Sequence, residues 1–133
     1  MSDAIFVGID VAKAHLDFAV RPAGTHERYR NDEAGIAQIC GRLQTQTPVL
    51  VVMEATGGLE VPLAAALAAA GLAVAVVNPR QVRDFAKAIG QLAKTDALDA
   101  HPLARFAEVV RPEPRPLPDA DAQNLSAALA RRQ

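Results

Sequence analysis

The sequence predicts an α/β domain, a mixed sheet of roughly five strands with helices on both faces. Two observations predict this fold class. Short apolar or alternating runs with brief turns between them open the chain, which is typical of strands paired in antiparallel hairpins. Apolar runs then alternate with stretches at helical spacing, and strand–helix–strand units pair their strands in parallel through right-handed crossovers.

Length and composition limit what this domain can be. The chain has 133 residues, the size of one domain, and 50% of them are hydrophobic, which is enough for a sizeable core. Its formal charge of -1 gives no overall attraction to nucleic acid, so such binding needs a local basic face. One cysteine, Cys40, excludes an internal disulfide framework and a cysteine-based zinc site. There are no signal-peptide features, and Pro62 and Gly71 interrupt the longest apolar stretch, so we expect a cytoplasmic protein without a membrane span.

The first three strands are predicted from their hydrophobic patterns. Ile5 to Ile9 is continuously apolar, as in a strand buried on both faces. His15 to Val20 alternates, as in a half-buried strand, and the short gap between the two runs indicates a hairpin. A turn at Pro22 to Gly24 then leads to a polar edge strand over Thr25 to Arg30.

Helices and buried strands alternate in the remainder of the domain. Asn31 or Asp32 can cap a helix over residues 32–45. The strand Val49 to Met53 ends at Glu54, and a glycine turn then leads into a second helix. The apolar stripe of the first helix is Ile36, Ile39, Cys40 and Leu43. The stripe of the second is Leu59, Leu63 and Leu67.

After Gly71 a further strand is predicted over Leu72 to Val77, and Asn78 can cap a helix that begins at Pro79. The apolar face of that helix is Val82, Phe85, Ala86 and Ile89. A last helix covers roughly residues 96–110, or begins near Asp99 so that Pro102 falls in its first turn. We therefore expect residues 1–111 to form the domain. Residues 112–133 would be a stiff proline-rich linker and the start of another helix, as in a fragment of a longer protein.

Four acids occupy positions where chemistry is expected. Asp10 and Glu54 each end a buried strand, and parallel neighbours would bring both to the carboxyl edge of the sheet, where open α/β sheets place their sites. Asp96 and Asp99 are three residues apart, so they are neighbours on a helix. They begin a stripe predicted to face the sheet, which continues through Leu103, Phe106 and Val110.

Converging carboxylates repel one another unless a cation binds between them. Oxygen ligands suit Mg²⁺ or Mn²⁺, and two such ions about 4 Å apart can hold the attacking and the leaving oxygen of a phosphoryl transfer. Each acid alone also fits a structural role: Asp10 as a turn residue, Glu54 as a cap of the Gly57-Gly58 turn, and Asp96 or Asp99 as a helix cap. Other polar residues are interpreted as solvated, surface or strand residues: Asp17, Asp84, His15, His26 and His101.

Basic residues lie near these acids in the sequence. Spacings of 3, 4 and 7 would place four of them on one stripe if the helix persisted: Arg80, Arg83, Lys87 and Lys94. The functional interpretation is contact with a phosphate backbone, and the alternative is an ordinary solvated helix face. Lys13, in the turn after Asp10, is a further candidate phosphate ligand.

Four motifs together resemble the DEDD-type transposases of bacterial insertion sequences. In the family's order they are Val7-Gly-Ile-Asp-Val-Ala-Lys13, Met53-Glu-Ala-Thr-Gly57, Asn78-Pro-Arg80 and Lys94-Thr-Asp-Ala-Leu-Asp-Ala100. The resemblance covers nearly all of the chain and corresponds to the family's N-terminal domain, which has a RuvC-like, RNase H-type fold. It implies that Asp10, Glu54, Asp96 and Asp99 are catalytic metal ligands that cleave and join DNA strands.

The resemblance also implies bacterial DNA as the substrate, association with the nucleoid, an oligomer and a bridging guide RNA. In the family a second domain carries a catalytic serine, whereas Ser2 and Ser126 lack a matching context, so the enzyme would be incomplete. One alternative is a truncated module that binds nucleic acid or its own partner subunits without cutting. Another is an ATPase of the actin and sugar-kinase superfamily, whose phosphate loop needs glycine where this chain has Val11.

Overall fold

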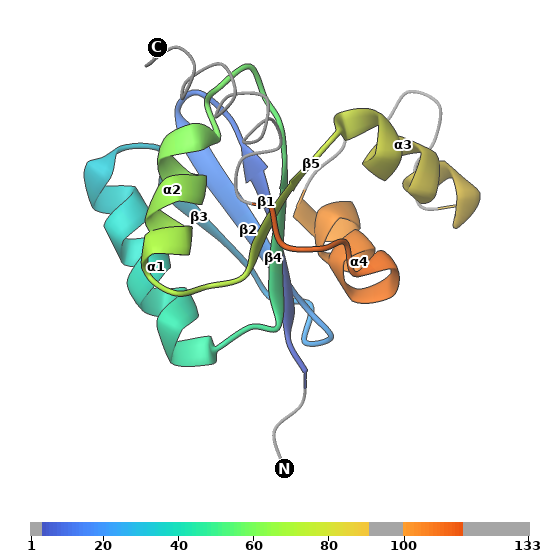
Figure 1. The fold of residues 1–133 in the computed structure, drawn as a ribbon, viewed down its shortest axis with the longest axis horizontal. Helices are drawn as coiled ribbons and strands as arrows, with labels where there is room; N and C mark the ends of the chain where they lie inside the picture. Colours follow the sequence, from blue (N-terminus) through green and yellow to red (C-terminus); the bar gives the residue numbers. More distant parts are fainter. Residues whose placement is uncertain (1–3, 91–99, 116–133) are drawn as a thin grey trace, which may run out of the picture.

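The computed structural model of the protein describes residues 4–90 and 100–115. Within these ranges a five-stranded sheet lies between two layers of helices (Figure 1). The mixed α/β architecture that the sequence predicts is therefore confirmed. Three of the predicted site residues lie outside the described residues, as does the predicted C-terminal helix; those residues are Lys94, Asp96 and Asp99.

The sheet has the strand order β3-β2-β1-β4-β5. Its strands are β1 (Phe6–Val11), β2 (His15–Arg21), β3 (His26–Arg30), β4 (Leu50–Glu54) and β5 (Val74–Val77). The first three strands pair antiparallel, as their short turns predict. β1 pairs with β4 and β4 with β5 in parallel, because a helix crosses over between the members of each pair.

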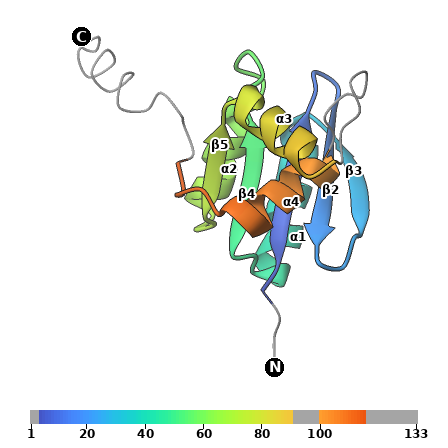
Figure 2. The ribbon, with the colours of Figure 1, turned by 90° about the vertical axis from the view of Figure 1, so that its right-hand side faces the viewer.

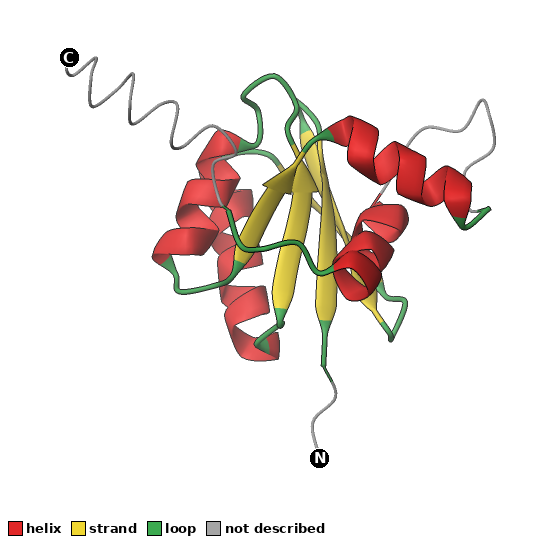
Figure 3. Ribbon diagram, turned by 45° about the vertical axis from the view of Figure 1, so that its right-hand side comes forward, coloured by secondary structure: helices red, strands yellow, loops and turns green. Residues whose placement is uncertain are grey.

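Each helix follows from a local signal in the sequence. The described helices are α1 (Glu33–Gln46), α2 (Val61–Ala69), α3 (Pro79–Ala88) and α4 (Ala100–Val110). Asp32 caps α1 by accepting a hydrogen bond of 2.8 Å from the Gly35 N–H, and Asn78 caps α3 by accepting one of 2.8 Å from the Arg80 N–H. α1 and α2 cover one face of the sheet, and α3 and α4 lie on the other (Figures 1 and 3).

The strands divide their side chains between two apolar layers. On β1, Val7 and Ile9 point toward the layer that α1 and α2 cover, whereas Phe6 packs with residues of α3 and α4. Because side chains alternate along a strand, Gly8 and Asp10 share the face of Phe6. Here we call this face, on which α4 lies, the front face of the sheet.

Gly8 allows α4 to pack directly on the sheet. A Cβ atom at Gly8 would lie 2.1 Å from the Ala104 backbone nitrogen and 2.5 Å from the Ala100 carbonyl oxygen. Ala19 of β2 is also buried against Ala100 and Ala104, so the contact is made of small residues. α4 thus crosses β1 and β2 in close contact (Figure 2). Gly8, where the contact is tightest, lies two residues before Asp10.

Three predicted packing positions are wrong. Leu59 is 37% exposed because α2 begins two residues later, at Val61. Ile89 is 36% exposed because α3 ends at Ala88. Val110 is 46% exposed because it is the last residue of α4, where the chain turns away at Arg111 with a φ of 51°.

Pro102 is the third residue of α4 as the structure describes it. Both predicted starts of this helix, near Asp96 and near Asp99, lie outside the described residues. Beyond α4, Arg115 forms a parallel bridge with Ala75 on the outer edge of β5. The beginning of the proline-rich segment is thus extended, and it is docked against the sheet.

Candidate metal centre

Asp10 and Glu54 meet at the carboxyl edge of the sheet. Ile9 and Met53 are partners in the parallel β1–β4 ladder, and the two acids follow this pair by one residue on each strand. Glu54 shares the front face with Val52, which packs in the same apolar layer as Phe6, so both acids are on the front face. The sequence placed them on one edge, and the register of the strands brings them together.

The electrostatics of Glu54 favour a bound cation. Burial raises the pKa of Glu54 most strongly, the charge of Asp10 raises it further, and Arg83 opposes both effects. Its Oε2 atom is buried and accepts no hydrogen bond from the part of the chain that the structure describes. A half-buried carboxylate oxygen beside a second carboxylate is costly unless a positive charge is added. The carboxylate oxygens present here therefore fit a hard divalent cation.

Asp17 belongs to the same neighbourhood, and its interpretation as a solvated or strand-edge residue is wrong. It is the cross-strand partner of Asp10, and its side chain is only 14% exposed. β3 places Arg28 opposite Asp17, and the guanidinium donates to both carboxylate oxygens, at 2.7 and 3.2 Å. The Nε2 atom of His26 lies 3.8 Å from the same carboxylate.

Glu60 is a structural residue of the site that sequence reasoning missed. It is 5% exposed, and its Oε1 atom accepts hydrogen bonds from the backbone N–H groups of Thr56, at 2.8 Å, and Gly58, at 3.1 Å. Glu60, and not Glu54, therefore caps the turn that follows β4. An acid between a glycine turn and an apolar helix was the available signal for this role.

The other two predicted ligands, Asp96 and Asp99, lie outside the described residues, and Asp99 directly precedes Ala100 in the sequence. Among the described residues, no group of three or more histidine, cysteine or acidic side chains is arranged to hold a metal ion. The structure thus brings together two of the four predicted acids and describes neither of the others.

The predicted basic residues of α3 are all exposed: Arg80, Arg83 and Lys87. Of these, Arg83 lies close enough to influence the pKa of Glu54. Asp84 is exposed, as predicted. Lys13 is exposed in the β1–β2 turn, next to the carboxyl edge of the sheet.

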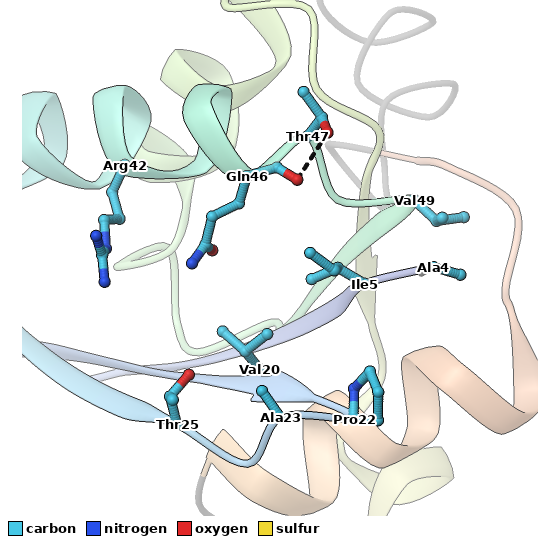
Figure 4. A pocket seen from close by; sticks show the side chains of 10 residues that line it. All are labelled: Ala4, Ile5, Val20, Pro22, Ala23, Thr25, Arg42, Gln46, Thr47 and Val49. Carbon is cyan, nitrogen blue, oxygen red and sulfur yellow. Dashed lines mark hydrogen bonds between the residues drawn. The ribbon is translucent and has the colours of Figure 1, made fainter. Parts of the chain in front are cut away.

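A cavity of about 720 Å³ lies at the other end of the sheet, between α1 and the starts of β1 and β4 (Figure 4). Its apolar floor includes Ile5, Val20 and Val49. Gln46 projects from α1 among these residues, and its Oε1 atom is buried without a hydrogen bond from the described residues. Because Ile5 and Asp10 are at opposite ends of β1, this cavity is separate from the acidic pair.

In the described ranges, no helix combines the length and the apolar character needed to cross a membrane.

Comparisons with known proteins agree with the fold described above. A pilin gene-inverting protein of Moraxella lacunata is 29% identical to the chain over an alignment of 113 positions, which covers 80% of this chain and 35% of that protein. This chain therefore spans about a third of the length of that relative. A solved structure of T. thermophilus RuvC in complex with a Holliday junction substrate covers 85% of this chain and 100% of its own, with a TM-score of 0.55 and 17% identity. The chain accordingly has the RuvC-like, RNase H-type fold.

Residues 7–133 match the model of a protein family described as "Transposase", the DEDD transposases of the IS110 type. This match spans both strand-terminal acids and almost the whole sequence. The chain belongs to the IS110-type DEDD transposase family.

Proposed function

We propose that this domain is the nuclease centre of a transposase, which cleaves DNA phosphodiesters and transfers strands with the help of divalent metal ions. Asp10, Glu54, Asp96 and Asp99 are the proposed ligands. The observation that carries the proposal is the pairing of Asp10 with Glu54 on one edge and one face, with a buried Glu54 oxygen left without a hydrogen bond from the described residues.

Two Mg²⁺ or Mn²⁺ ions bound by these acids would activate the attacking oxygen and stabilise the leaving oxygen of the phosphodiester. The residues of the chain supply the positions of the ligands. β1 and β4 fix Asp10 and Glu54 on a rigid sheet, and Glu60 holds the loop that follows Glu54. Arg83 adds positive charge beside Glu54, where a phosphate group would approach.

We propose DNA as the substrate because the family is one of transposases and the neighbour of known structure holds a Holliday junction. Arg80, Arg83, Lys87, Lys94 and Lys13 are the proposed phosphate contacts. A bridging guide RNA, an oligomer and a nucleoid-associated cytoplasmic location are further proposals for the full-length protein. We also propose that residues 1–111 contain the catalytic fold and that residues 112–133 lead into the rest of the protein.

Metal binding can be tested on the 133-residue chain itself. We expect Mn²⁺ to raise the melting temperature, because a ligand at 100 times its Kd stabilises a protein by about 2.7 kcal/mol. Asp10→Ala and Glu54→Gln should abolish this rise. Glu33→Gln, which removes an exposed acid at the start of α1, should leave it unchanged. A rise that persists in Asp10→Ala would contradict the proposed ligand set.

Cleavage is tested on branched and linear DNA with Mg²⁺, with this chain and with the chain extended at its C-terminus. We expect cleavage by the extended chain and none by its Asp10→Ala variant. If the extended chain binds DNA but neither cleaves it nor binds Mn²⁺, the alternative of a non-cleaving nucleic-acid-binding module is correct.

A further inference from the structure

Basic side chains form a row on the front face of β3. The sequence pattern predicted this strand only as a polar edge strand. Side chains alternate along the strand, and Tyr29 stacks on Phe18 on the α1 side of the sheet, with ring centroids 5.8 Å apart. His26, Arg28 and Arg30 therefore point to the front face, and all three are exposed.

The first of these three residues contacts α4. The ring of His26 stacks on His101 of α4, with centroids 5.6 Å apart. Arg28 lies two residues further along the strand, toward the carboxyl edge of the sheet, and 60% of its side chain is exposed. Arg28 and Arg30 therefore lie nearer than His26 to the edge where Asp10 and Glu54 lie.

Arg28 is held in a fixed orientation beside the proposed metal ligands. Asp10, Asp17 and Arg28 are successive cross-strand partners on β1, β2 and β3. The Nε and Nη2 atoms of Arg28 both donate to Asp17, so the plane of the guanidinium is set by a carboxylate that is mostly buried. A guanidinium has five N–H donors, and this pair uses two of them. The other three point away from the Asp17 carboxylate.

Arg30 extends the basic row to the carboxyl edge. It pairs with His15 at the end of the β2–β3 ladder. The following residue, Asn31, donates from its side chain to the Ala12 carbonyl, at 2.8 Å, and from its backbone N–H to the Ala14 carbonyl, at 3.0 Å. These bonds tie the end of β3 to the turn that carries Lys13, so Arg30 and Lys13 belong to one part of the edge.

We propose that Arg28 and Arg30, together with Lys13, bind the phosphate backbone of the DNA strand whose phosphodiester reaches Asp10 and Glu54, and that Asp17 positions Arg28 for this contact. The proposal rests on the proposed nuclease function. Arg28 and Arg30 are two residues apart on an extended strand, about 6.8 Å, a spacing that suits successive phosphates of one nucleic-acid strand. The acidic pair would then be flanked by basic residues on two sides, those of β3 and those of α3.

The test measures DNA binding by the full 133-residue chain in EDTA, so that neither metal binding nor cleavage contributes. The probes are a fluorescently labelled four-way junction and a duplex of the same sequence, read by anisotropy across a salt series. A phosphate contact adds about 0.9 to the slope of log K against log salt for duplex DNA, which is about eightfold in affinity between 0.1 M and 1 M salt. We expect Arg28→Gln and Arg30→Gln each to reduce the slope by about this amount and to raise Kd about eightfold in 0.1 M salt.

Arg42→Gln is the matched control. Arg42 is also an exposed arginine paired with a carboxylate, that of Glu27, but it belongs to α1 on the opposite side of the sheet. We expect its Kd and slope to equal those of the unmodified chain. The proposal is overturned if the Arg28→Gln, Arg30→Gln double variant binds within twofold of the unmodified chain, or if the unmodified chain does not bind either DNA at 50 mM salt.

Asp17→Asn tests the positioning role. Removal of a negative charge should tighten DNA binding if Asp17 acts only through its charge. If Asp17 orients Arg28, binding should instead weaken, by about threefold, and the effect should disappear in the Arg28→Gln background. If Asp17→Asn tightens DNA binding both in the unmodified chain and in the Arg28→Gln variant, the positioning role is refuted. Because this assay contains no metal, its outcome is separate from Mn²⁺ stabilisation, which tests the nuclease function through Asp10 and Glu54.

Discussion

The ionised form of Glu54, which the proposed metal binding needs, lowers the stability of the metal-free domain. Burial and the charge of Asp10 raise its pKa, so the folded domain without metal holds a proton on Glu54 more tightly than the unfolded chain does. A raised carboxylate pKa contributes stability at low pH, and this contribution is lost as pH rises through the folded-state pKa. At neutral pH the ionised side chain therefore costs stability, a cost that a bound cation would offset.

Glu54→Gln should stabilise the metal-free domain at pH 7, by a few tenths to about 1 kcal/mol, because it removes repulsion between neighbouring acids on adjacent strands. The gain should shrink as pH falls through the raised pKa of folded Glu54, and it should be lost near and below the ordinary glutamate value of 4.5, where the unmodified side chain is protonated in both states. Thermal melts in EDTA between pH 4 and 8 measure this difference. A gain that is equal at both ends of the range would show that charge is not the cause.

The functional context of Asp17 could not be predicted from its own sequence neighbourhood. Its alternation with Leu16 and Phe18 correctly indicated a half-buried strand, and an acid on the polar face then appeared solvated. What makes it a buried, ion-paired residue is Arg28, 11 positions later on another strand. Cross-strand partners are set by register, and hydrophobic pattern alone does not fix register across a polar edge strand.

At the level of elements, the contact between β1 and α4 holds the described part of α4 against the sheet, two residues from Asp10 along β1. Gly8→Ala would push a Cβ atom to 2.1 Å from the Ala104 backbone nitrogen, and a backbone atom cannot move aside as a side-chain tip can. We expect a loss of about 3 kcal/mol or more in the free energy of unfolding, at the upper end of overpacking effects. Chemical denaturation measures this loss, and we also expect weaker Mn²⁺ binding.

Gly41→Ala is the control for this substitution. Gly41 lies inside α1, and apart from its own chain neighbours and the backbone of the same helix no described atom is within 4 Å of the Cβ position, so alanine should stabilise the helix by about 0.5–1 kcal/mol. If both substitutions had the same effect, the close approach of α4 to Gly8 would not be the reason for glycine at that position.

For the whole molecule, patterns that depend on near neighbours predicted the fold well. Apolar and alternating runs predicted four of the five strands, and the turn at Pro22 to Gly24 predicted the polar edge strand that follows it. Asp32 and Asn78 indicated the starts of two helices. The misplaced residues, such as Val110, lie at helix ends, where a periodic pattern continues but the contact with the sheet does not. The candidate site was predicted only in part. Strand ends identified Asp10 and Glu54, and the role of Glu60 had a local signal that was missed, whereas the roles of Asp17 and of the basic row on β3 depend on tertiary contacts.

The boundary of the domain is a property of the whole molecule. The Arg115 N–H donates to the Val74 carbonyl at 2.6 Å, and the Arg115 carbonyl accepts from the Val76 N–H at 2.8 Å. N–H groups alternate between the two sides of an extended strand. The backbone nitrogen that faces outward just before Arg115 is therefore that of Pro114, and proline has no N–H to donate. The segment therefore pairs with β5 while offering no donor to a further strand, which is a recognised protection for a sheet edge.

We expect residues 112–115 to add stability to the fold of residues 1–111, because Arg115 pairs with β5. A chain that ends at Arg111 loses two backbone hydrogen bonds, worth about 2 kcal/mol together, and exposes β5 as an open edge. Its melting temperature should fall and its light scattering should rise with concentration, whereas a chain that ends at Pro118 should melt like the 133-residue protein. Equal melting of the two shortened chains would show that the docked segment adds nothing to the fold. A lower melting temperature for the shorter chain alone would mean that the segment after α4 is anchored on β5, beside the strand that carries Glu54.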